Sequence, residues 1–283
     1  MSLASNHSIE LELVKKPPSK YSMVFESRAL LDIAAMPFLL VASKFSKKAS
    51  SASYPIIMFP GFGASELHMK ALEYHLRNLG YATEGWGLGR NEAGLNLDHR
   101  CEDLSSDWGL EPTDTRPKES YNGEGSVAFL CQKAIARVRQ RSKELGTPVI
   151  IIGWSLGGYI ARECARELPD EVAQVITFGS PIVGGPKYTR AVEFFRNRGL
   201  DIDWIEESIE QRNSNPIKQP ITCIYSKSDA IVSLYAALDR VSPNVKNVEV
   251  KSSHFGMGFN RRVWGIVKSA LESNARQQIN SQY

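Results

Sequence analysis

Residues 149–158 read Val-Ile-Ile-Ile-Gly-Trp-Ser-Leu-Gly-Gly, and this stretch sets the expectations for the rest of the chain. An apolar run that ends in glycine, followed by helical periodicity, predicts a buried strand, a turn and a helix. Ser155 stands between Gly153 and Gly157 on that turn, and Gly-x-Ser-x-Gly spacing forces such a side chain outward at the carboxyl edge of a sheet. A Cβ at either glycine would collide with neighbouring backbone, so we expect both positions to require glycine.

Composition indicates one globular domain. The chain has 283 residues, of which 42% are hydrophobic and 23% are charged. These values are ordinary for a protein with a buried core. The net charge is only +3, with 34 basic residues interspersed among 31 acidic ones. This balance argues against a DNA or RNA partner.

Four cysteines are widely spaced: Cys101, Cys131, Cys164 and Cys223. They form no Cys-x-x-Cys pair, and no histidine cluster accompanies them. We therefore expect reduced structural cysteines rather than disulfides or a metal site, and we expect no metal and no organic cofactor.

The N-terminal region, residues 1–53, differs in composition from the rest. Residues 1–22 are polar and lack the apolar core of a secretory signal, which favours a loosely ordered tail and a cytoplasmic location. The segment from Phe25 to Phe45 is apolar and helix-compatible, although it contains Asp32 and Pro37. Its longest uncharged run is about half of the ~20 residues needed to span a bilayer.

Two interpretations of this helix stay open. It packs on the surface of its own domain, or residues 25–48 form an amphipathic element that rests on a membrane, assisted by Lys44, Lys47 and Lys48. Residues 46–53 are small and polar and read as a linker into a catalytic domain of residues 54–283.

Strands and helices are predicted to alternate through the catalytic domain. Apolar runs with strand character occur at 54–63, 81–86, 148–153, 172–178, 221–225 and 245–250, and helical periodicity at 65–80, 127–145, 156–168 and 261–275. Such alternation implies an α/β fold, with a mostly parallel sheet covered by helices on both faces. Residues 92–124 read as a long surface excursion, and residues 182–219 as a cap-like insertion over the site.

Three side chains that together make a catalytic triad each follow a predicted strand: Ser155, Asp229 and His254. A serine hydroxyl needs an imidazole to accept its proton, and the imidazole needs a carboxylate to fix its tautomer. The chain order serine, aspartate, histidine is the order found in α/β-hydrolases. Asp201 and Asp203 are competing acids, but they lie in the irregular insertion.

An oxyanion hole is expected from two backbone N–H groups. Leu156 presents its N–H at a helix start, directly after the nucleophile. The second donor is assigned by position to Phe62, in a loop where Gly61 and Gly63 let the backbone bend towards a substrate. Arg90 and Asn91 are expected to hold a loop near this edge rather than to react.

Five motifs together resemble an uncharacterised group of bacterial α/β-hydrolase-fold proteins that are labelled esterase or lipase: Pro-Gly-Phe-Gly-Ala-Ser at 60–65, Gly-Trp-Gly-Leu-Gly-Arg-Asn at 85–91, Gly-Trp-Ser-Leu-Gly-Gly at 153–158, Tyr-Ser-Lys-Ser-Asp at 225–229 and Ser-His-Phe-Gly at 253–256. The resemblance covers roughly residues 24–272. It implies that Ser155 is the nucleophile, Asp229 the acid and His254 the base. Ala230 stands where glycine is expected, and the 92–124 insertion is longer than usual, so substrate preference stays open.

The sequence as a whole predicts a serine hydrolase that cleaves a small-molecule or lipid carboxylic ester through an acyl-enzyme. Acyl transfer to an alcohol on the same triad is an alternative. A non-catalytic ligand-binding protein on the same scaffold is another. The sequence contains no motif that fixes the acyl chain length or the oligomeric state.

Overall fold

The structure is a computed structural model that describes residues 14–45, 48, 53–98, 123 and 125–281. Most of the predicted 46–53 linker, most of the 92–124 excursion, the first part of the N-terminal tail and Cys101 therefore lie outside the described residues.

A six-stranded parallel sheet forms the centre, in the order β2-β1-β3-β4-β5-β6. The strands are β1 (Ile56–Phe59), β2 (Thr83–Gly85), β3 (Val149–Trp154), β4 (Val172–Phe178), β5 (Ile221–Tyr225) and β6 (Val245–Glu249). Every residue of β1 and β3 is buried, which is why these strands read as continuous apolar runs.

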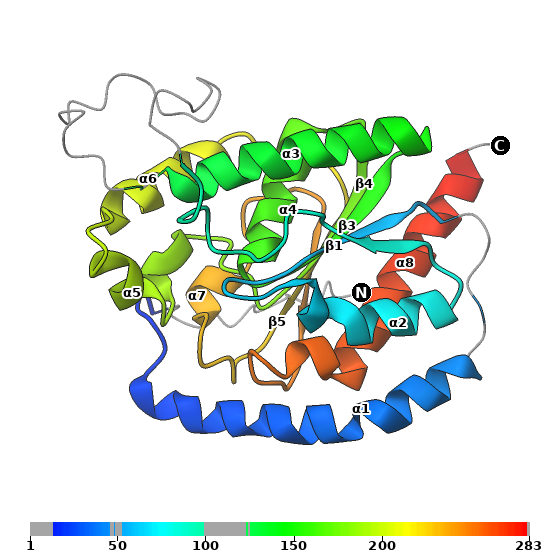
Figure 1. Cartoon of the computed structure of the whole chain (residues 1–283), viewed down its shortest axis with the longest axis horizontal. Coiled ribbons are helices and arrows are strands. Elements are labelled where there is room, and N and C mark those ends of the chain that lie inside the picture. Colours follow the sequence, from blue (N-terminus) through cyan, green and yellow to red (C-terminus); the bar gives the residue numbers. More distant parts are fainter. Residues whose placement is uncertain (1–13, 46–47, 49–52, 99–122, 124, 282–283) are drawn as a thin grey trace, which may run out of the picture.

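Helices cover both faces of the sheet (Figure 1). Alternate strand residues point to opposite faces, so Ile57 and Phe59 join one core with α3 (Ser126–Leu145) and α4 (Leu156–Glu167). Ile56 and Met58 join the other core with α2 (Lys70–Asn78) and α8 (Arg261–Ser281). The predicted layered α/β architecture is confirmed.

Element boundaries differ from the prediction at a few ends. The edge strand expected at 81–86 pairs with β1 only over Thr83–Gly85. The helix expected at 65–80 begins as a 3₁₀ turn, η2 (Glu66–Met69), and becomes α-helical only at Lys70. The last helix continues past the expected Ala275 to Ser281.

The N-terminal segment forms a 3₁₀ helix, η1 (Lys20–Arg28), and then α1 (Ala29–Lys44). α1 continues through Pro37 and lies along one edge of the molecule, against α2 and the 3₁₀ helix η7 (Met257–Phe259) (Figure 1). Its inner side chains Met36, Leu39 and Leu40 pack on the core cluster of α2 and α8. Within the described ranges, no helix combines the length and apolar character needed to cross a bilayer.

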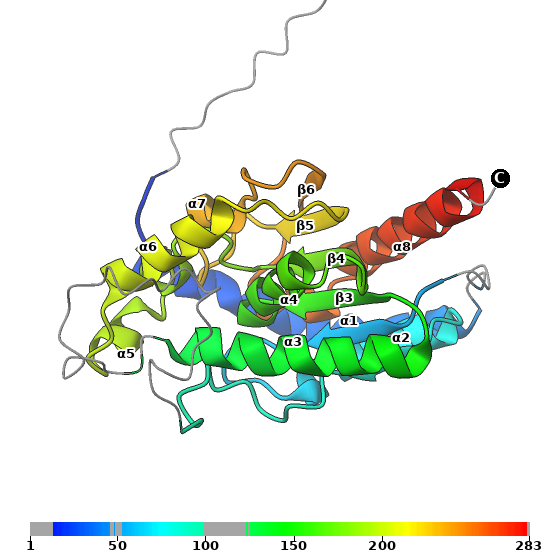
Figure 2. The ribbon, with the colours of Figure 1, turned by 90° about the horizontal axis from the view of Figure 1, so that it is seen from above.

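Residues 182–219 form a helical cap: η6 (Gly185–Tyr188), α5 (Val192–Arg196) and α6 (Ile202–Asn213). The short helix α7 (Leu234–Ala237) lies beside η6. Figures 1 and 2 both place α5 and α6 at the end of the molecule opposite the last turns of α8. Val192, Phe195 and Leu200 pack against Phe62 and Leu156, so the cap lies directly over the predicted site.

A half-buried histidine is expected to make the stability of this fold depend on pH. His75 of α2 stacks on Trp264 of α8 with ring centroids 4.8 Å apart. Its Nδ1 is buried and has no hydrogen-bond partner among the described residues. Burial, assisted by the nearby positive charge of Lys268, lowers the pKa of His75 below its ordinary 6.5.

The sign of the pH effect follows from this shift. Below about pH 6.5 the unfolded chain binds a proton at His75 that the folded chain resists, so stability falls as the pH is lowered through that window. We expect His75→Phe, which keeps the ring stack, to lose less unfolding free energy than the wild type between about pH 7.5 and pH 5.5. Urea unfolding at the two pH values measures this difference, and an identical loss in both proteins would contradict it.

Candidate active site

Ser155 lies on a tight turn between β3 and α4, with φ 53° and ψ −126°. Positive φ is uncommon for a residue with a side chain, and it persists only where the surroundings enforce it. A Cβ on Gly153 would come within 2.4 Å of Gly158 Cα, and one on Gly157 within 2.4 Å of the Phe59 carbonyl oxygen. The prediction that both positions require glycine is confirmed.

The structure brings the three predicted catalytic side chains together. Ser155 Oγ lies 3.1 Å from His254 Nε2, and His254 Nδ1 lies 2.9 Å from Asp229 Oδ2. The second oxygen of Asp229, Oδ1, accepts the N–H groups of Ile231 and Val232, each at 2.8 Å. Because Asp229 and His254 are both buried, these contacts fix the carboxylate and the imidazole in one orientation.

The competing acids have other partners in the cap. Asp201 caps the start of α6 by accepting the N–H groups of Asp203 and Trp204. Asp203 pairs with Lys187 at 2.5 Å. Asp229 is therefore the acid that contacts the histidine.

The predicted oxyanion loop lies against the serine. A Cβ on Gly61 would lie 3.0 Å from Ser155 Cβ, so the loop approaches this closely because residue 61 is glycine. Phe62, Leu156 and Ser155 line the same cavity. Among the described hydrogen bonds, neither the Phe62 N–H nor the Leu156 N–H is donated to a protein acceptor, so both suit a substrate oxygen.

Asn91 holds this loop in place, as expected. It is fully buried, its Nδ2 donates to the Pro60 carbonyl at 2.8 Å, and its own carbonyl accepts the Gly63 N–H at 2.7 Å. Arg90 adds a 2.7 Å hydrogen bond from Nε to the Gly63 carbonyl. The loop is thus preorganised before any ligand arrives.

A cavity of about 210 Å³ opens beside Ser155 under the cap. Phe62, Trp154 and Leu156 form its wall near the serine, and His254 and Phe255 lie beside them. The cap contributes mostly apolar side chains: Ala191, Phe195, Leu200, Trp204, Ile205 and Ile209. The cavity therefore suits an apolar group attached to the atom that Ser155 attacks.

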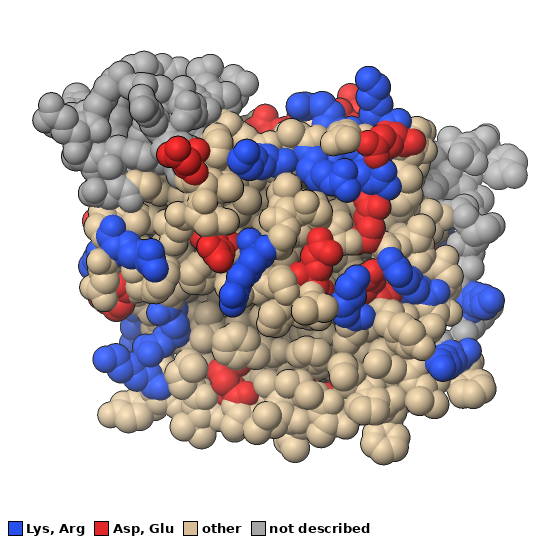
Figure 3. Space-filling model, viewed as in Figure 1, with Lys and Arg blue, Asp and Glu red and all other residues tan. Residues whose placement is uncertain are grey.

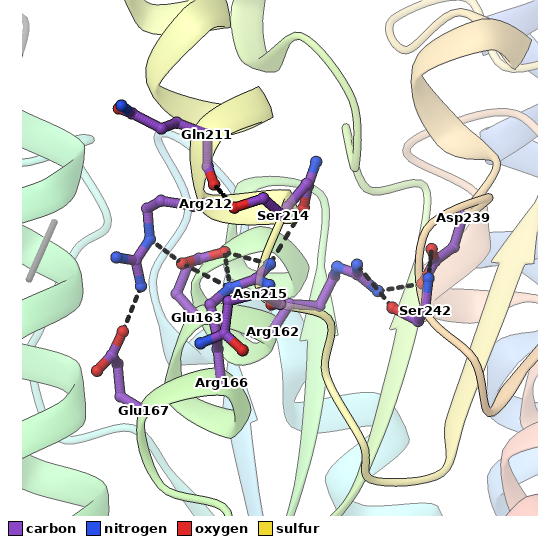
Figure 4. Close-up of polar contacts among 11 residues, drawn as sticks. Arg162, Glu163, Arg166, Glu167, Gln211, Arg212, Ser214, Asn215, Asp239 and Ser242 are labelled. Carbon is purple, nitrogen blue, oxygen red and sulfur yellow. Dashed lines mark hydrogen bonds and ion pairs between the residues drawn. The ribbon is translucent and has the colours of Figure 1, made fainter. Parts of the chain in front are cut away.

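Buried ion pairs fix the cap to the helix that follows the nucleophile (Figure 4). Arg212 of α6, which also lines the cavity, contacts Glu163 and Glu167 of α4 at 2.5 Å each. Arg166 also pairs with Glu163, at 3.2 Å. Burial raises the pKa of the Glu163 carboxyl, but the two guanidinium groups outweigh burial and hold it below its ordinary value. These ion pairs connect the cap to α4, and removing either partner would leave a buried charge uncompensated.

Sequence analysis missed Glu26, a buried residue of η1. Its Oε1 accepts the N–H groups of Ala230 at 3.1 Å and His254 at 3.0 Å, and its Oε2 accepts the Phe255 N–H at 3.0 Å. One carboxylate therefore connects the loop after Asp229 to the loop that carries His254. The sequence signal that could have found Glu26 is its position as an acid among apolar residues, because a buried carboxylate needs hydrogen-bond partners.

Asp32 of α1 makes a second connection to the same region. Its Oδ1 accepts from Asn260 Nδ2 at 3.1 Å, and its Oδ2 lies 3.5 Å from Ser252 Oγ. Burial raises the pKa of Asp32, while the hydrogen bond from Asn260 and the charge of Arg28 oppose this effect. Both acids of the helical N-terminal segment thus point into the domain.

Three of the four cysteines lie within the described residues. Cys131, Cys164 and Cys223 are buried free thiols. Among the described residues, no group of three histidine, cysteine, aspartate or glutamate side chains is placed to hold a metal ion.

Comparison with known proteins identifies the fold. No protein-family model and no curated protein matches the chain. A lipase from Bacillus licheniformis superposes with a TM-score of 0.51 at 14% identity, over 79% of this chain and 94% of that one. A monoacylglycerol lipase from Paleococcus ferrophilus gives 0.48 at 14% identity, over 80% and 98%. Mouse alpha/beta hydrolase domain-containing protein 10 gives 0.43 at 17% identity, over 83% and 92%.

The superposition on the Bacillus licheniformis lipase, together with the six-stranded parallel sheet and its helices, gives the chain the predicted α/β-hydrolase fold. At these identities the likeness extends to the fold alone.

The steric argument at the nucleophile turn is testable with glycine variants. We expect Gly157→Ala to destabilise the protein by about 1–3 kcal/mol, because the added methyl group overlaps backbone atoms that cannot move aside. Gly265→Ala is the matched control. No atom lies within 4 Å of the added methyl in α8, and alanine there should stabilise by about 0.5–1 kcal/mol. Urea unfolding measures both, and equal effects of the two substitutions would contradict the argument.

The role of Glu26 is testable by amide hydrogen exchange. Glu26→Gln replaces one acceptor oxygen with an NH₂ group that faces backbone donors. Losing such a bond costs about 1–3 kcal/mol, so exchange should be about five- to 150-fold faster at whichever of the Ala230, His254 and Phe255 amides faces the NH₂ group. Glu66→Gln is the control, since Glu66 accepts the Gly87 N–H at 2.9 Å on another loop. Unchanged exchange at the three amides in Glu26→Gln would show that the carboxylate does not hold these loops.

Proposed function

We propose that this protein is a serine hydrolase that cleaves carboxylic esters through an acyl-enzyme intermediate. The observation that carries the proposal is the hydrogen-bond chain from Ser155 through His254 to Asp229, at 3.1 and 2.9 Å, beside an apolar cavity. A hydroxyl, an imidazole and a carboxylate in this order form the arrangement that activates serine for acyl transfer.

In the acylation step, Ser155 Oγ attacks the ester carbonyl carbon while His254 Nε2 accepts the hydroxyl proton. Asp229 keeps the Nδ1 proton of the imidazole in place and stabilises the cation that forms. The carbonyl oxygen becomes an oxyanion, which the Phe62 and Leu156 N–H groups are placed to receive. One such donor contributes about 3–4 kcal/mol to transition-state stability.

Collapse of this intermediate breaks the bond between the carbonyl carbon and the ester oxygen. His254 gives its proton to the leaving alcohol, and the acyl group stays on Ser155. Water then attacks the acyl-enzyme while His254 accepts a proton from it. The second collapse releases a carboxylic acid and returns the proton to Ser155 Oγ, so the catalyst is restored.

The cavity indicates which part of the substrate it holds. Its walls under the cap are mostly apolar, and Ser155 and His254 are among the residues that line it. An acyl or alcohol portion of hydrocarbon character fits such a space, because its transfer from water is favourable. The protein is accordingly proposed to act on esters with an apolar portion.

A fluorophosphonate probe tests the proposal, since it reacts covalently with an activated serine. We expect the wild type to be labelled, Ser155→Ala to be unlabelled, and ester hydrolysis to fall by about 10⁴-fold or more in Ser155→Ala and His254→Ala. Ser208→Ala is the matched control, because Ser208 lines the same cavity but bonds to the Trp204 carbonyl. Folded wild type that resists the probe, or label that persists in Ser155→Ala, would refute a Ser155 hydrolase.

A further inference from the structure

The outer side of α1 exposes a row of large apolar side chains. Leu31 and Phe38 are seven residues apart and so lie on one line along the helix, and Phe45 follows directly after its last residue; the three are 72%, 80% and 85% exposed. Leu30 and Val41 flank this row at 68% and 57% exposure. These five residues are called the outer face of α1. Single exposed apolar residues are ordinary, but a contiguous row marks a surface that binds something.

The preceding 3₁₀ helix extends the same apolar character. Tyr21, Val24 and Phe25 of η1 are 89%, 74% and 58% exposed. Figure 3 shows that the lowest rim of the molecule, occupied by α1 in Figure 1, is mostly uncharged, with Lys or Arg towards both ends and a few acidic atoms just above its middle.

Within this segment the exposed charges have one sign. Between Lys20 and Lys48 the only acidic residues are Glu26 and Asp32, and both point into the domain, towards the His254 loop and Ser252. The described basic residues of this stretch are all exposed: Lys20, Arg28, Lys44 and Lys48. An apolar row with exposed cations at its ends matches the surface of an anionic bilayer, which offers hydrocarbon beneath negative headgroups.

A second copy of the chain fits this surface less well. Pairing two outer faces of α1 in either direction would bring the cations of one copy towards those of the other, since no exposed acid lies between Lys20 and Lys48. Like charges in close contact oppose association, whereas anionic headgroups attract all of them. The charge pattern therefore favours lipid over self-association.

The same segment is connected to the candidate active site. Phe255 lines the cavity beside Ser155 and is 46% exposed, so the cavity wall reaches the surface at this residue. Its N–H is bound by Glu26 of η1. The apolar surface and the wall of the cavity are thus joined through one carboxylate.

We infer that η1 and the outer face of α1 dock on an anionic lipid bilayer and that the enzyme draws a lipid ester from it into the cavity beside Ser155. The docking part stands on the exposed apolar row and its cations. The choice of a membrane-resident ester rests on the proposed hydrolase function.

Vesicle co-sedimentation of the full chain tests the docking part. The probe is vesicles of phosphatidylglycerol and phosphatidylcholine in equal amounts, compared with phosphatidylcholine alone. We expect binding to the anionic vesicles, at least about tenfold weaker binding for Leu31→Glu/Phe38→Glu, and about 25-fold weaker binding for Lys44→Gln/Lys48→Gln, fivefold for each charge. Leu145→Glu, an exposed apolar residue at the end of α3, should bind as the wild type does.

Several results would overturn the docking proposal. Wild type that stays in the supernatant, or Leu31→Glu/Phe38→Glu that sediments equally well, would do so. Analytical ultracentrifugation tests whether the outer face of α1 binds something other than lipid. A wild-type dimer that Leu31→Glu/Phe38→Glu dissociates, without vesicle binding, would assign the face to a second copy, and a monomer that ignores vesicles would assign it to another protein or another part of the chain.

Activity separates this inference from the proposed function. Leu31→Glu/Phe38→Glu should hydrolyse a water-soluble short-chain ester at the wild-type rate but lose at least about tenfold on an ester embedded in anionic vesicles. Equal rates on both substrates would overturn the membrane route while leaving the hydrolase intact. Because binding does not need Ser155, Ser155→Ala should sediment with vesicles as the wild type does, whatever the outcome for hydrolysis.

Discussion

The strained turn at Ser155 is the constraint on which the site depends. Its φ of 53° is held because β3 is paired on both sides by β1 and β4, and because α4 begins immediately after it. The two glycines let the start of α4 approach within contact distance of β3 and of the Phe59 carbonyl. The Gly61 loop and the imidazole contact this serine, and the cap lines the cavity beside it. Rigid elements set this arrangement, and loops supply the chemistry.

Much of this arrangement is predictable because its signals are local. Glycine spacing, an apolar run and the following helical periodicity are read within ten residues at 149–158. Ser155, Asp229 and His254 are predicted by their positions in the loops that follow strands, and parallel strands bring their carboxyl ends to one edge. Pairings between distant elements then follow from topology, without any knowledge of individual contacts.

The role of Glu26 could not be predicted from local sequence signals. Its acceptor role depends on backbone N–H groups that are 204, 228 and 229 residues away, and backbone groups carry no sequence signature. The same holds for Arg212, whose pairing with Glu163 is visible only after the cap has been placed over α4. The short edge strand β2 and the passage of α1 through Pro37 also reflect tertiary packing, which overrides local propensity.

The two buried acids beside His254, Asp229 and Glu26, have different hydrogen-bond partners. Asp229 contacts the imidazole and accepts two N–H groups from its own loop, whereas the hydrogen bonds that Glu26 accepts from the loops of Ala230 and His254 come from backbone N–H groups. A basic partner for Glu26 would have placed a second charge near the imidazole. Backbone donors satisfy its oxygens without one. The N-terminal segment therefore braces the histidine loop, while Asp229 is the carboxylate that contacts the imidazole.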